Sequence, residues 1–547
     1  MGISQMALTD RNGLYGIPHF IQCAREAGIA PVIGTETVTE DHRAVLLVRD
    51  QTGYENLCRL LSDLHCREDF DLPSAIAQYR DGLCILTDNA RVLRPLKRVS
   101  PEDLFVELSP GHQMHRALAL ARDTGLPPVA TTRALLLDPE DHALHRVLRA
   151  IHLNTRLSRL TPSDTARERD LLLSPKRIAD HFPHCPEAME NTVLVSDRCR
   201  TDWNYSGFVF PSFNGMEDEE AYETLRQRAL KGAVWRYGRI TPDLQQRFDR
   251  ELVLIRDKGF AHYFLVVEEL ARRSERTCGR GSAAASLVAY CLGITHVDPM
   301  KHNLFFERFL NEGRLDPPDI DVDFPWDERD EILDFAFARY GSRRTAMVAN
   351  QVSFRARGAV RDVAKVFGIP AADIKTFTRR LSGFGRTTKT GDRVHNHPLF
   401  SGERFDEKWR KIINIASKLD GQLRHLSLHC GGLVVVPDEI RRYVPVQVSA
   451  KGLPVIQWEK DQTESAGLVK IDILGNRSLA VIRDAIAAVK TNTGVEIDYA
   501  RFKPLEDADT RLLIREGRTM GCFYIESPAT RQLLARMWGL KPHPRAL

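Results

Sequence analysis

The sequence predicts an α/β protein built from several domains. Its 547 residues exceed what one hydrophobic core usually organises, so we expect roughly three or four domains. In the first third of the chain, short apolar runs alternate with amphipathic helical stretches. This alternation is typical of a largely parallel sheet with helices between its strands.

The expected elements follow from these patterns. Pro and Asn signals at 196–216 mark a boundary after a loop-rich connector. Helical sequence follows over 219–277, then a mixed strand region over 431–474 and a helix over 477–490. In the first third, the expected strands are 5–9, 31–34, 44–48, 83–87 and 128–132, and the expected helices include 17–27 and 114–124.

Charge and cysteine content exclude several protein classes. The net charge is only +4, but residues 341–424 contain 18 Lys and Arg against 7 Asp and Glu. Such a surplus can neutralise several phosphates, although a solvated helical face is the commoner explanation of a charge run. The ten cysteines include no C-x-x-C pair, which argues against a zinc ribbon or a disulfide framework. With no long apolar run, we expect a cytoplasmic protein without a membrane span.

An acidic segment carries the clearest chemical signal. Residues 317–324 read Pro-Pro-Asp-Ile-Asp-Val-Asp-Phe, so Asp319, Asp321 and Asp323 share one face of a predicted strand. Carboxylates this close repel one another unless a cation lies between them, and paired hard cations support phosphoryl transfer. A calcium loop would need glycine where Phe324 stands. A solvated acidic edge strand stays open as an alternative.

A glycine-containing loop precedes this strand. Residues 278–287 read Cys-Gly-Arg-Gly-Ser-Ala-Ala-Ala-Ser-Leu, a tight loop that opens an Ala-rich helix and can cradle a phosphate. A dinucleotide fingerprint also fits formally, but charged helical sequence over 269–276 stands where its strand should be. A glycine turn before a buried helix explains the loop equally well. The loop followed by paired aspartates is more specific and indicates a nucleotidyltransferase.

A third carboxylate stands alone in a second apolar strand. Residues 467–475 read Gly-Leu-Val-Lys-Ile-Asp-Ile-Leu-Gly, which places Lys470 and Asp472 on one face. A buried aspartate is costly without a partner. Asp472 is therefore either half of a structural pair with Lys470 or a third metal ligand beside a lysine that neutralises triphosphate charge.

With these motifs assembled, the sequence resembles the alpha subunit of bacterial DNA polymerase III, a C-family polymerase of replicative or error-prone type. The resemblance runs through essentially the whole chain. The matching stretches are 7–16 (Ala-Leu-Thr-Asp-Arg-Asn-Gly-Leu-Tyr-Gly), 279–290, 305–311 (Phe-Phe-Glu-Arg-Phe-Leu-Asn), 318–324, 428–432 (Leu-His-Cys-Gly-Gly) and 467–475.

The resemblance implies four kinds of domain and a chain truncated at both ends. They are an α/β domain of the polymerase-and-histidinol-phosphatase (PHP) type, a nucleotidyltransferase palm like that of polymerase beta, a helical thumb and the start of the fingers. The PHP-like domain is expected to form an incomplete barrel, because a first strand with a His-x-His pair should lie ahead of Met1. The implied bounds are 1–195 for the PHP-like domain, 196–350 and 429–478 for the palm, 351–428 for the thumb and 479–547 for the fingers.

The implied activity is template-directed DNA synthesis in replication or repair. A primer 3′-hydroxyl would attack the α-phosphate of a dNTP with the help of two Mg²⁺ ions. The implied partners are primer–template DNA and dNTP; in the full-length family they also include a sliding clamp and other replisome subunits, whose clamp-binding region is missing here. Asp319, Asp321 and Asp472 match the family's metal-binding aspartates, whereas Asp323 is not a principal ligand. Gly281 and Ser282 match its triphosphate loop, Arg308 and Lys470 match basic residues near the nucleotide, and Arg355, Arg357, Arg361 and Lys365 fall in the basic thumb, where we expect contacts with the DNA backbone.

The N-terminal domain departs from the metal-competent members of the family. Those members read Thr-Asp-His where this chain reads Thr-Asp-Arg over 9–11, so Arg11 replaces a histidine. They read Asn-Asp-x-His where this chain reads Thr-Arg-Ala-Leu over 132–135. Asp10 and Glu36 remain at ligand positions, but a guanidinium cannot ligate a metal. We therefore expect a structural domain without nuclease activity.

The far end of the chain departs from the family as well. Residues 521–527 resemble the start of the fingers, whereas 538–547 do not resemble the family. Two alternatives to an active polymerase stay open. One is a catalytically inactive remnant that binds DNA, and the other, less favoured, is a PHP-type metal-dependent phosphoesterase.

Overall fold

The computed structural model describes residues 2–111, 113–199, 207–314, 316–381, 406–499 and 506–539. The chain forms two compact units, each assembled from separate stretches of sequence. The first unit comprises Met1–Gly207, Ala346–His429 and Asp438–Leu468. The second comprises Phe208–Thr345, Cys430–Pro437 and Val469–Leu547. No helix among the described residues is long and apolar enough to span a bilayer.

A six-stranded sheet forms the centre of residues 1–199. Its strands lie side by side in chain order, and only β3 runs antiparallel to its neighbours, so the expected largely parallel sheet is confirmed. The strands are β1 (Gln5–Arg11), β2 (Ala30–Val38), β3 (Arg43–Val48), β4 (Leu83–Thr87), β5 (Leu104–Leu108) and β6 (Pro128–Ala130). The helices are α1 (Ile17–Glu26), α2 (Gln51–Cys66), α3 (Leu72–Tyr79), α4 (Ala90–Val99), α5 (Met114–Thr124), α6 (Asp141–His152), α7 (Pro175–Ala179) and α8 (Pro186–Arg198).

Strand β5 was absent from the expected elements. Its five residues, Leu-Phe-Val-Glu-Leu, are all buried, including the carboxylate of Glu107. Glutamate is rarely fully buried unless it is paired with partners of opposite charge, so the sequence alone did not indicate a buried strand here. Arg43 and Arg133 supply those partners, and both lie on other segments of the chain.

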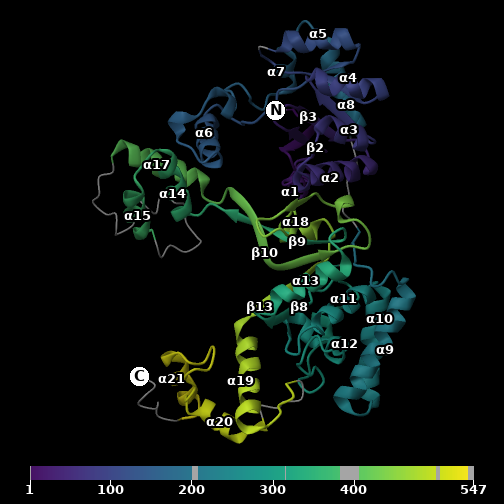
Figure 1. Ribbon diagram of the computed structural model, residues 1–547, viewed down its shortest axis with the longest axis vertical. Coiled ribbons are helices and arrows are strands. Elements are labelled where there is room, and N and C mark those ends of the chain that lie inside the picture. Colours follow the sequence, from purple (N-terminus) through teal and green to yellow (C-terminus); the bar gives the residue numbers. More distant parts are fainter. Residues whose placement is uncertain are drawn as a thin grey trace. The chain divides into compact units, whose positions relative to one another are not determined.

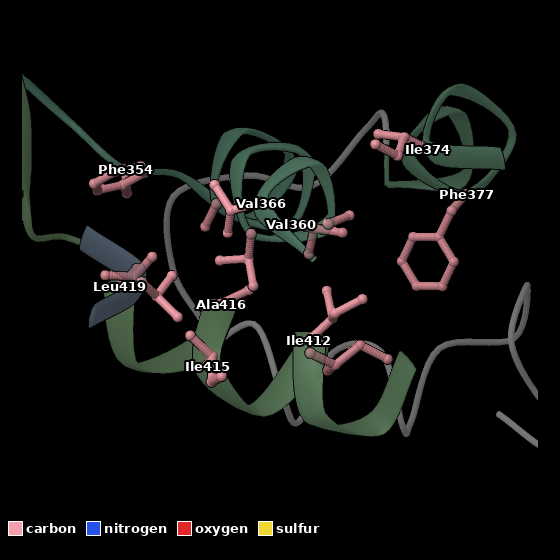
Figure 2. Close-up of a cluster of buried hydrophobic side chains, with 14 of the residues drawn as sticks. Phe354, Val360, Val366, Ile374, Phe377, Ile412, Ile415, Ala416 and Leu419 are labelled. Carbon is pink, nitrogen blue, oxygen red and sulfur yellow. The ribbon is translucent and has the colours of Figure 1, made fainter. Parts of the chain in front are cut away.

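Residues 356–381 and 406–419 of the first unit form a helical subdomain. Its helices are α14 (Ala356–Val366), α15 (Ala371–Arg380) and α17 (Glu407–Leu419). Figure 2 shows Val360 and Val366 of α14 facing Ile412 and Ala416 of α17 across a buried apolar cluster. Val147 and Ala150 of α6 join the same cluster, so the helical subdomain is anchored to the N-terminal segment. Part of the expected thumb, 382–405, lies outside the described residues.

Residues 438–468 pack against the N-terminal sheet domain within the first unit. The indole of Trp458 is fully buried and donates from Nε1 to the carbonyl of Leu14 at 3.0 Å. Arg441 donates to Asp63 at 2.5 Å. The strands and helix of this stretch and its neighbour are β9 (Thr345–Ser353), β11 (Val446–Val448), β12 (Pro454–Ile456) and α18 (Lys460–Ser465).

The second unit begins with the helices expected over 219–277 and then forms a small mixed sheet (Figure 1). Within it, the C-terminal part of β10 (Leu423–Val435) pairs with β13, β13 pairs in parallel with β8, and β8 pairs with β7. The elements are α9 (Asp218–Tyr237), α10 (Pro242–Asp257), α11 (Ala261–Ala271), β7 (Cys278–Arg280), α12 (Leu287–Cys291), β8 (Asp321–Pro325), α13 (Arg329–Tyr340), β13 (Lys470–Asn476), α19 (Arg477–Thr493), α20 (Ala508–Arg515) and α21 (Pro528–Met537).

Candidate functional site

Two of the three predicted aspartates lie opposite each other in the second unit. Asp321, the first residue of β8, is the Cα partner of Asp472 in the parallel strand β13. Across β8, Asp321 is also the partner of Arg280, the last residue of β7. Because register partners project from the same face of a sheet, the two carboxylates and the guanidinium share one face.

Asp319 lies in the segment that leads into β8 and is not part of the strand. We expected Asp319, Asp321 and Asp323 to alternate along one strand, but the strand begins at Asp321. The physical reason is partly local and partly a contact with helix α11. Two prolines precede Asp319, and the backbone N–H of Ile320 donates to the Tyr263 hydroxyl at 3.1 Å instead of to a neighbouring strand. Asp319 is exposed and still contributes to the electrostatic environment of Asp321.

Asp323 has a structural environment. Its side chain is 10% exposed, accepts from Asn476 Nδ2 at 2.8 Å and lies 3.6 Å from Arg280 Nε. These contacts tie β8 to the end of β13 and to β7. Asp323 thus has the contacts of a residue that holds neighbouring strands together. That it is not a principal metal ligand stays a prediction.

The carboxylates of Asp321 and Asp472 differ in their cationic neighbours. Lys470 Nζ donates to Asp472 Oδ2 at 2.6 Å, and both side chains are largely buried. Arg280 Nε is 3.8 Å from Asp321 Oδ2. Burial raises the pKa of Asp321, the nearby Asp472 raises it further, and Arg280 and Lys470 offset only part of this. The cations of the site therefore only partly offset the cost of burying a carboxylate beside a second one.

The glycine loop begins beside these carboxylates. Gly281 has φ +66°, and a Cβ placed there would lie 3.9 Å from Asp321 Oδ2. Two expectations about the loop were wrong. Its first three residues form the short strand β7, and the charged sequence before them is helical only as far as Ala271, where α11 ends. The residues after Arg280 form a 3-10 turn, η3 (Gly281–Ala285), and the α-helix starts only at Leu287.

A buried ion pair braces the end of that turn, and the sequence interpretation missed it. Glu251 of α10 is fully buried and accepts from the Ser286 hydroxyl at 2.9 Å and from the backbone N–H of Leu287 at 3.0 Å. Arg247 donates to Glu251 at 2.7 Å and to the carbonyl of Ala285 at 3.0 Å. The two side chains are four residues apart on a helix, a common surface pattern, so their burial was not visible in the sequence.

Tyr263 of α11 is a second residue that the sequence did not reveal. It is fully buried, and its hydroxyl accepts from Ile320 N between Asp319 and Asp321. Burial raises the pKa of this hydroxyl, and Asp319, Asp321 and Asp472 raise it further. The phenol is therefore neutral and close to all three aspartates, where it fixes the segment that carries two of them.

The remaining residues predicted to lie near the nucleotide occupy distinct positions. Ser282 follows Gly281 in η3, and Arg308 ends a 3-10 turn, η4 (Phe306–Arg308), that packs against η3. Arg308 is exposed, and among the described residues no hydrogen bond or ion pair links it to an aspartate. Lys470 lies on the aspartate face through its bond to Asp472. Thus Gly281 and Lys470 directly adjoin the carboxylates, whereas Arg308 is not bonded to them.

The predicted DNA-binding residues belong to the first unit. Arg357, Arg361 and Lys365 recur every four residues along α14, so they form one exposed stripe. Arg355 is the N-cap of the same helix and is also exposed. Asp362, the acidic residue between them, is paired with Arg424 at 2.7 Å. The stripe therefore presents its positive charge to solvent.

The donors at the aspartate site suit a hard divalent cation in chemistry. Carboxylate oxygens are the ligands that Mg²⁺ prefers. Burial first, and then the neighbouring Asp472, raises the pKa of Asp321, and a bound cation would favour the charged form of both carboxylates. No group of three or more His, Cys, Asp and Glu side chains in the described part of the chain is gathered tightly enough to enclose a metal. Asp321 and Asp472 thus form a paired donor set, with Asp319 at its exposed edge.

The N-terminal sheet domain has arginines where its carboxylates converge. Glu107 is buried between Arg43 and Arg133, and Arg133 also donates to Asp88 at 2.8 Å. Arg43 donates to Glu36 at 2.5 Å. Burial raises the pKa of Glu107, but the two guanidinium groups more than offset this and hold it below its usual value. Because Glu36, Asp88 and Glu107 are each already ion-paired with one or both arginines, the residues do not fit a metal centre.

Asp10, the other acidic residue at a predicted ligand position, has a structural partner. Its Oδ2 accepts from the backbone N–H of Gly16 at 2.7 Å, and burial raises its pKa. Leu135, at a position where a histidine is expected in a metal-competent domain, is 60% exposed. These contacts agree with a structural domain, and the absence of nuclease activity stays a prediction.

Comparisons with known proteins match the chain segment by segment. A family model described as the PHP domain matches residues 1–122. The bacterial DNA polymerase III alpha NTPase domain matches 223–475, and the bacterial DNA polymerase III alpha subunit finger domain matches 478–542. The expected order of PHP domain, polymerase domain and fingers is confirmed.

Whole-length relatives agree with these matches. An error-prone DNA polymerase of Symbiobacterium thermophilum is 32% identical over 98% of this chain and 53% of its own length. The DNA polymerase III subunit alpha of Bacillus subtilis is 30% identical over 98% of this chain and 51% of its own length. The chain spans about half the length of the curated relatives that it matches. Since all three matched segments and relatives along nearly its whole length agree, the chain belongs to the family of the bacterial DNA polymerase III alpha subunit.

Proposed function

We propose that this chain is a DNA-directed DNA polymerase that transfers a nucleotidyl group from a dNTP to a primer 3′-hydroxyl. The observation that carries the proposal is the register pairing of Asp321 with Asp472 on one face of a sheet, beside a glycine turn. The names of the relatives, error-prone DNA polymerase and DNA polymerase III subunit alpha, support the same reaction.

In the proposed site each residue has a defined task. Asp319, Asp321 and Asp472 would hold two Mg²⁺ ions, which when bound supply charge neutralisation at the phosphates and a lowered pKa at the primer hydroxyl. The backbone of Gly281 and Ser282 would receive the triphosphate, because the positive φ of Gly281 turns the chain beside Asp321 without a side chain in the way. Lys470 would orient Asp472 and add positive charge near the phosphates.

The partners proposed are primer–template DNA and dNTP. The exposed stripe of Arg357, Arg361 and Lys365, with Arg355 at its start, supports binding of the DNA backbone, because regularly spaced unneutralised cations attract phosphates irrespective of sequence. A sliding clamp and other replisome subunits belong to the proposal for the full-length family.

Primer extension tests the proposal directly. The 547-residue chain is incubated with a recessed primer–template, four dNTPs and Mg²⁺, and compared with Asp321→Ala. Asp334→Ala is the matched control, since it removes an exposed carboxylate from α13 of the same unit. We expect extension by the wild type and the control and a loss of at least about 100-fold in Asp321→Ala.

The same experiment separates the alternatives. No extension by the wild type, or equal extension by Asp321→Ala, would overturn the enzymatic proposal. DNA binding that persists in that case would identify a non-catalytic DNA-binding chain. Metal-dependent phosphate release by a chain that does not extend primers would instead support a phosphoesterase.

A further inference from the structure

A groove in the first unit lies where α6, α14 and α17 meet. Its volume is about 490 Å³, within the range of small-ligand sites. The turn η1 (Leu157–Arg159), which follows α6, forms one wall. Three cations line the groove, one from each of three segments: Arg146, Arg156 and Lys408.

These cations are not neutralised from within the described part of the protein. All three are exposed, and no described residue forms an ion pair with any of them. Elsewhere in the same unit arginines are commonly paired, as Arg424 is with Asp362 and Arg441 with Asp63. Among the described residues, none that lines the groove is acidic. Three unbalanced positive charges from separate segments therefore converge on one cavity, which favours a phosphate-bearing ligand.

The groove also has an apolar surface. Val366 is buried, and Leu157 and Phe367 are half-buried and pack on the cluster in Figure 2. Gly368 has φ +76°, and a Cβ there would lie 3.7 Å from Arg156 Nε, so any larger side chain would enter the space beside that guanidinium. An apolar surface that includes an aromatic ring and lies beside cations fits a nucleotide. The phosphate of the nucleotide would bind the cations, and its base would stack on the ring of Phe367.

We propose that this groove binds a single-stranded segment of nucleic acid, with phosphates at Arg146, Arg156 and Lys408 and a base against Phe367. The inference rests on the proposed function, because it extends the DNA-binding stripe of α14. Lys365, the last member of that stripe, directly precedes Val366 and donates to Asn154 Oδ1 at 2.7 Å, which ties the helix end to the turn that carries Arg156. A duplex would use the cations alone, since its stacked bases cannot cover Phe367.

Binding of a fluorescent 12-nucleotide oligo(dT) to the full chain tests the charges. The variant is Arg146→Ala/Arg156→Ala, and the matched control Arg116→Ala/Arg122→Ala removes two exposed arginines from α5. We expect the groove variant to bind about tenfold more weakly and its log Kd–log salt slope to fall by roughly 1.4, about 0.7 for each phosphate that is no longer neutralised. The control should keep the wild-type slope.

Phe367→Leu tests the base. Leucine keeps an apolar contact with the core but not the ring, so we expect about fivefold weaker binding of oligo(dT) with an unchanged salt slope. Urea unfolding of the variant verifies the fold. Free dTTP should compete with oligo(dT) only weakly. If dTTP instead binds the groove as tightly as oligo(dT) does, the groove is a mononucleotide site and the proposal of a single-stranded ligand is wrong.

The outcomes are separable from those of the proposed function. If the wild type binds duplex DNA or extends primers while the groove variants bind oligo(dT) as the wild type does, the groove inference fails and the polymerase proposal stands. If the wild type binds neither duplex nor single strand, both fail.

Discussion

Asp472 of β13 lies directly across from Asp321 of β8, and Lys470 is bonded to the Asp472 carboxylate on the same face. The pairing joins two segments that are far apart in the sequence, and it raises the pKa of Asp321 because a buried carboxylate faces a second one. Tyr263 and Glu251 hold the segments around this pair in place.

Tyr263→Phe should weaken the segment that carries Asp319 and Asp321. The substitution removes the acceptor of the buried Ile320 N–H, which costs about 1–3 kcal/mol of unfolding free energy. We expect slower primer extension with unchanged affinity for primer–template. Tyr222→Phe, at an α9 tyrosine for which no described residue provides a hydroxyl hydrogen bond, should change neither stability nor rate. Equal rates for Tyr263→Phe and the wild type would contradict a positioning role.

Glu251→Ala should be strongly destabilising. It leaves Arg247 without its carboxylate and the start of α12 without the acceptor for Leu287 N and Val288 N. Breaking such a buried pair costs about 3 kcal/mol, whereas the exposed pair of Glu223 with Arg226 should be worth less than about 1 kcal/mol. Urea unfolding of Glu251→Ala and Glu223→Ala measures the difference. Similar urea midpoints for the two variants would show that the contacts of Glu251 with Arg247 and the start of α12 contribute little to stability.

Acid should unfold the N-terminal sheet domain partly through Glu107. Its pKa is below the usual 4.5 in the folded state, because Arg43 and Arg133 outweigh its burial. The folded state therefore holds fewer protons than the unfolded state near that value, so the stabilisation is present above about pH 4.5 and is lost as the pH falls through the lowered pKa. Urea midpoints between about pH 7 and pH 3 should fall less steeply for Glu107→Gln. Parallel pH profiles would contradict this origin.

The same domain should not depend on metal. Because Glu36, Asp88 and Glu107 are each ion-paired with Arg43 or Arg133, added Zn²⁺ or Mn²⁺, or EDTA, should leave its thermal unfolding unchanged. Arg133→Ala should destabilise it by about 3 kcal/mol, since a buried carboxylate loses a partner. We also expect no release of nucleotides from a mismatched primer end. Metal-dependent stabilisation that persists in Asp321→Ala would overturn the prediction, because it could not come from the aspartate site.

The α14 stripe should contribute affinity without sequence preference. Arg357→Ala/Arg361→Ala should weaken binding to duplexes of different sequence by the same factor and lower the salt slope by roughly 1.8, about 0.9 for each phosphate that the two arginines no longer neutralise. Fluorescence anisotropy over a range of salt concentrations measures this. Arg116→Ala/Arg122→Ala again serves as the control of equal charge, and a slope that falls in the control as well would indicate a general charge effect.

Some elements of the fold and some contacts of the candidate site can be predicted from the sequence, and others cannot. Strand β4, helix α5 and the start of α19 follow directly from local patterns, because apolar periodicity specifies which face is buried. The bond between Lys470 and Asp472 follows from their spacing of two on a strand. The start of β8 at Asp321 did not follow, since it depends on Tyr263, which reaches Ile320 from another helix.

The sequence by itself determined the chemistry available to this protein: clustered carboxylates, a glycine turn, a basic helix, and an arginine at a position where a metal-binding histidine is expected in a metal-competent domain. Only the tertiary structure decided which of these groups meet. It pairs Asp321 with Asp472, leaves Asp319 at the edge, buries Glu251 beneath the glycine turn and places Glu107 between two arginines. The reason is physical: side-chain type is local, whereas burial and the electrostatic partners that set charge depend on strand register and packing between distant segments.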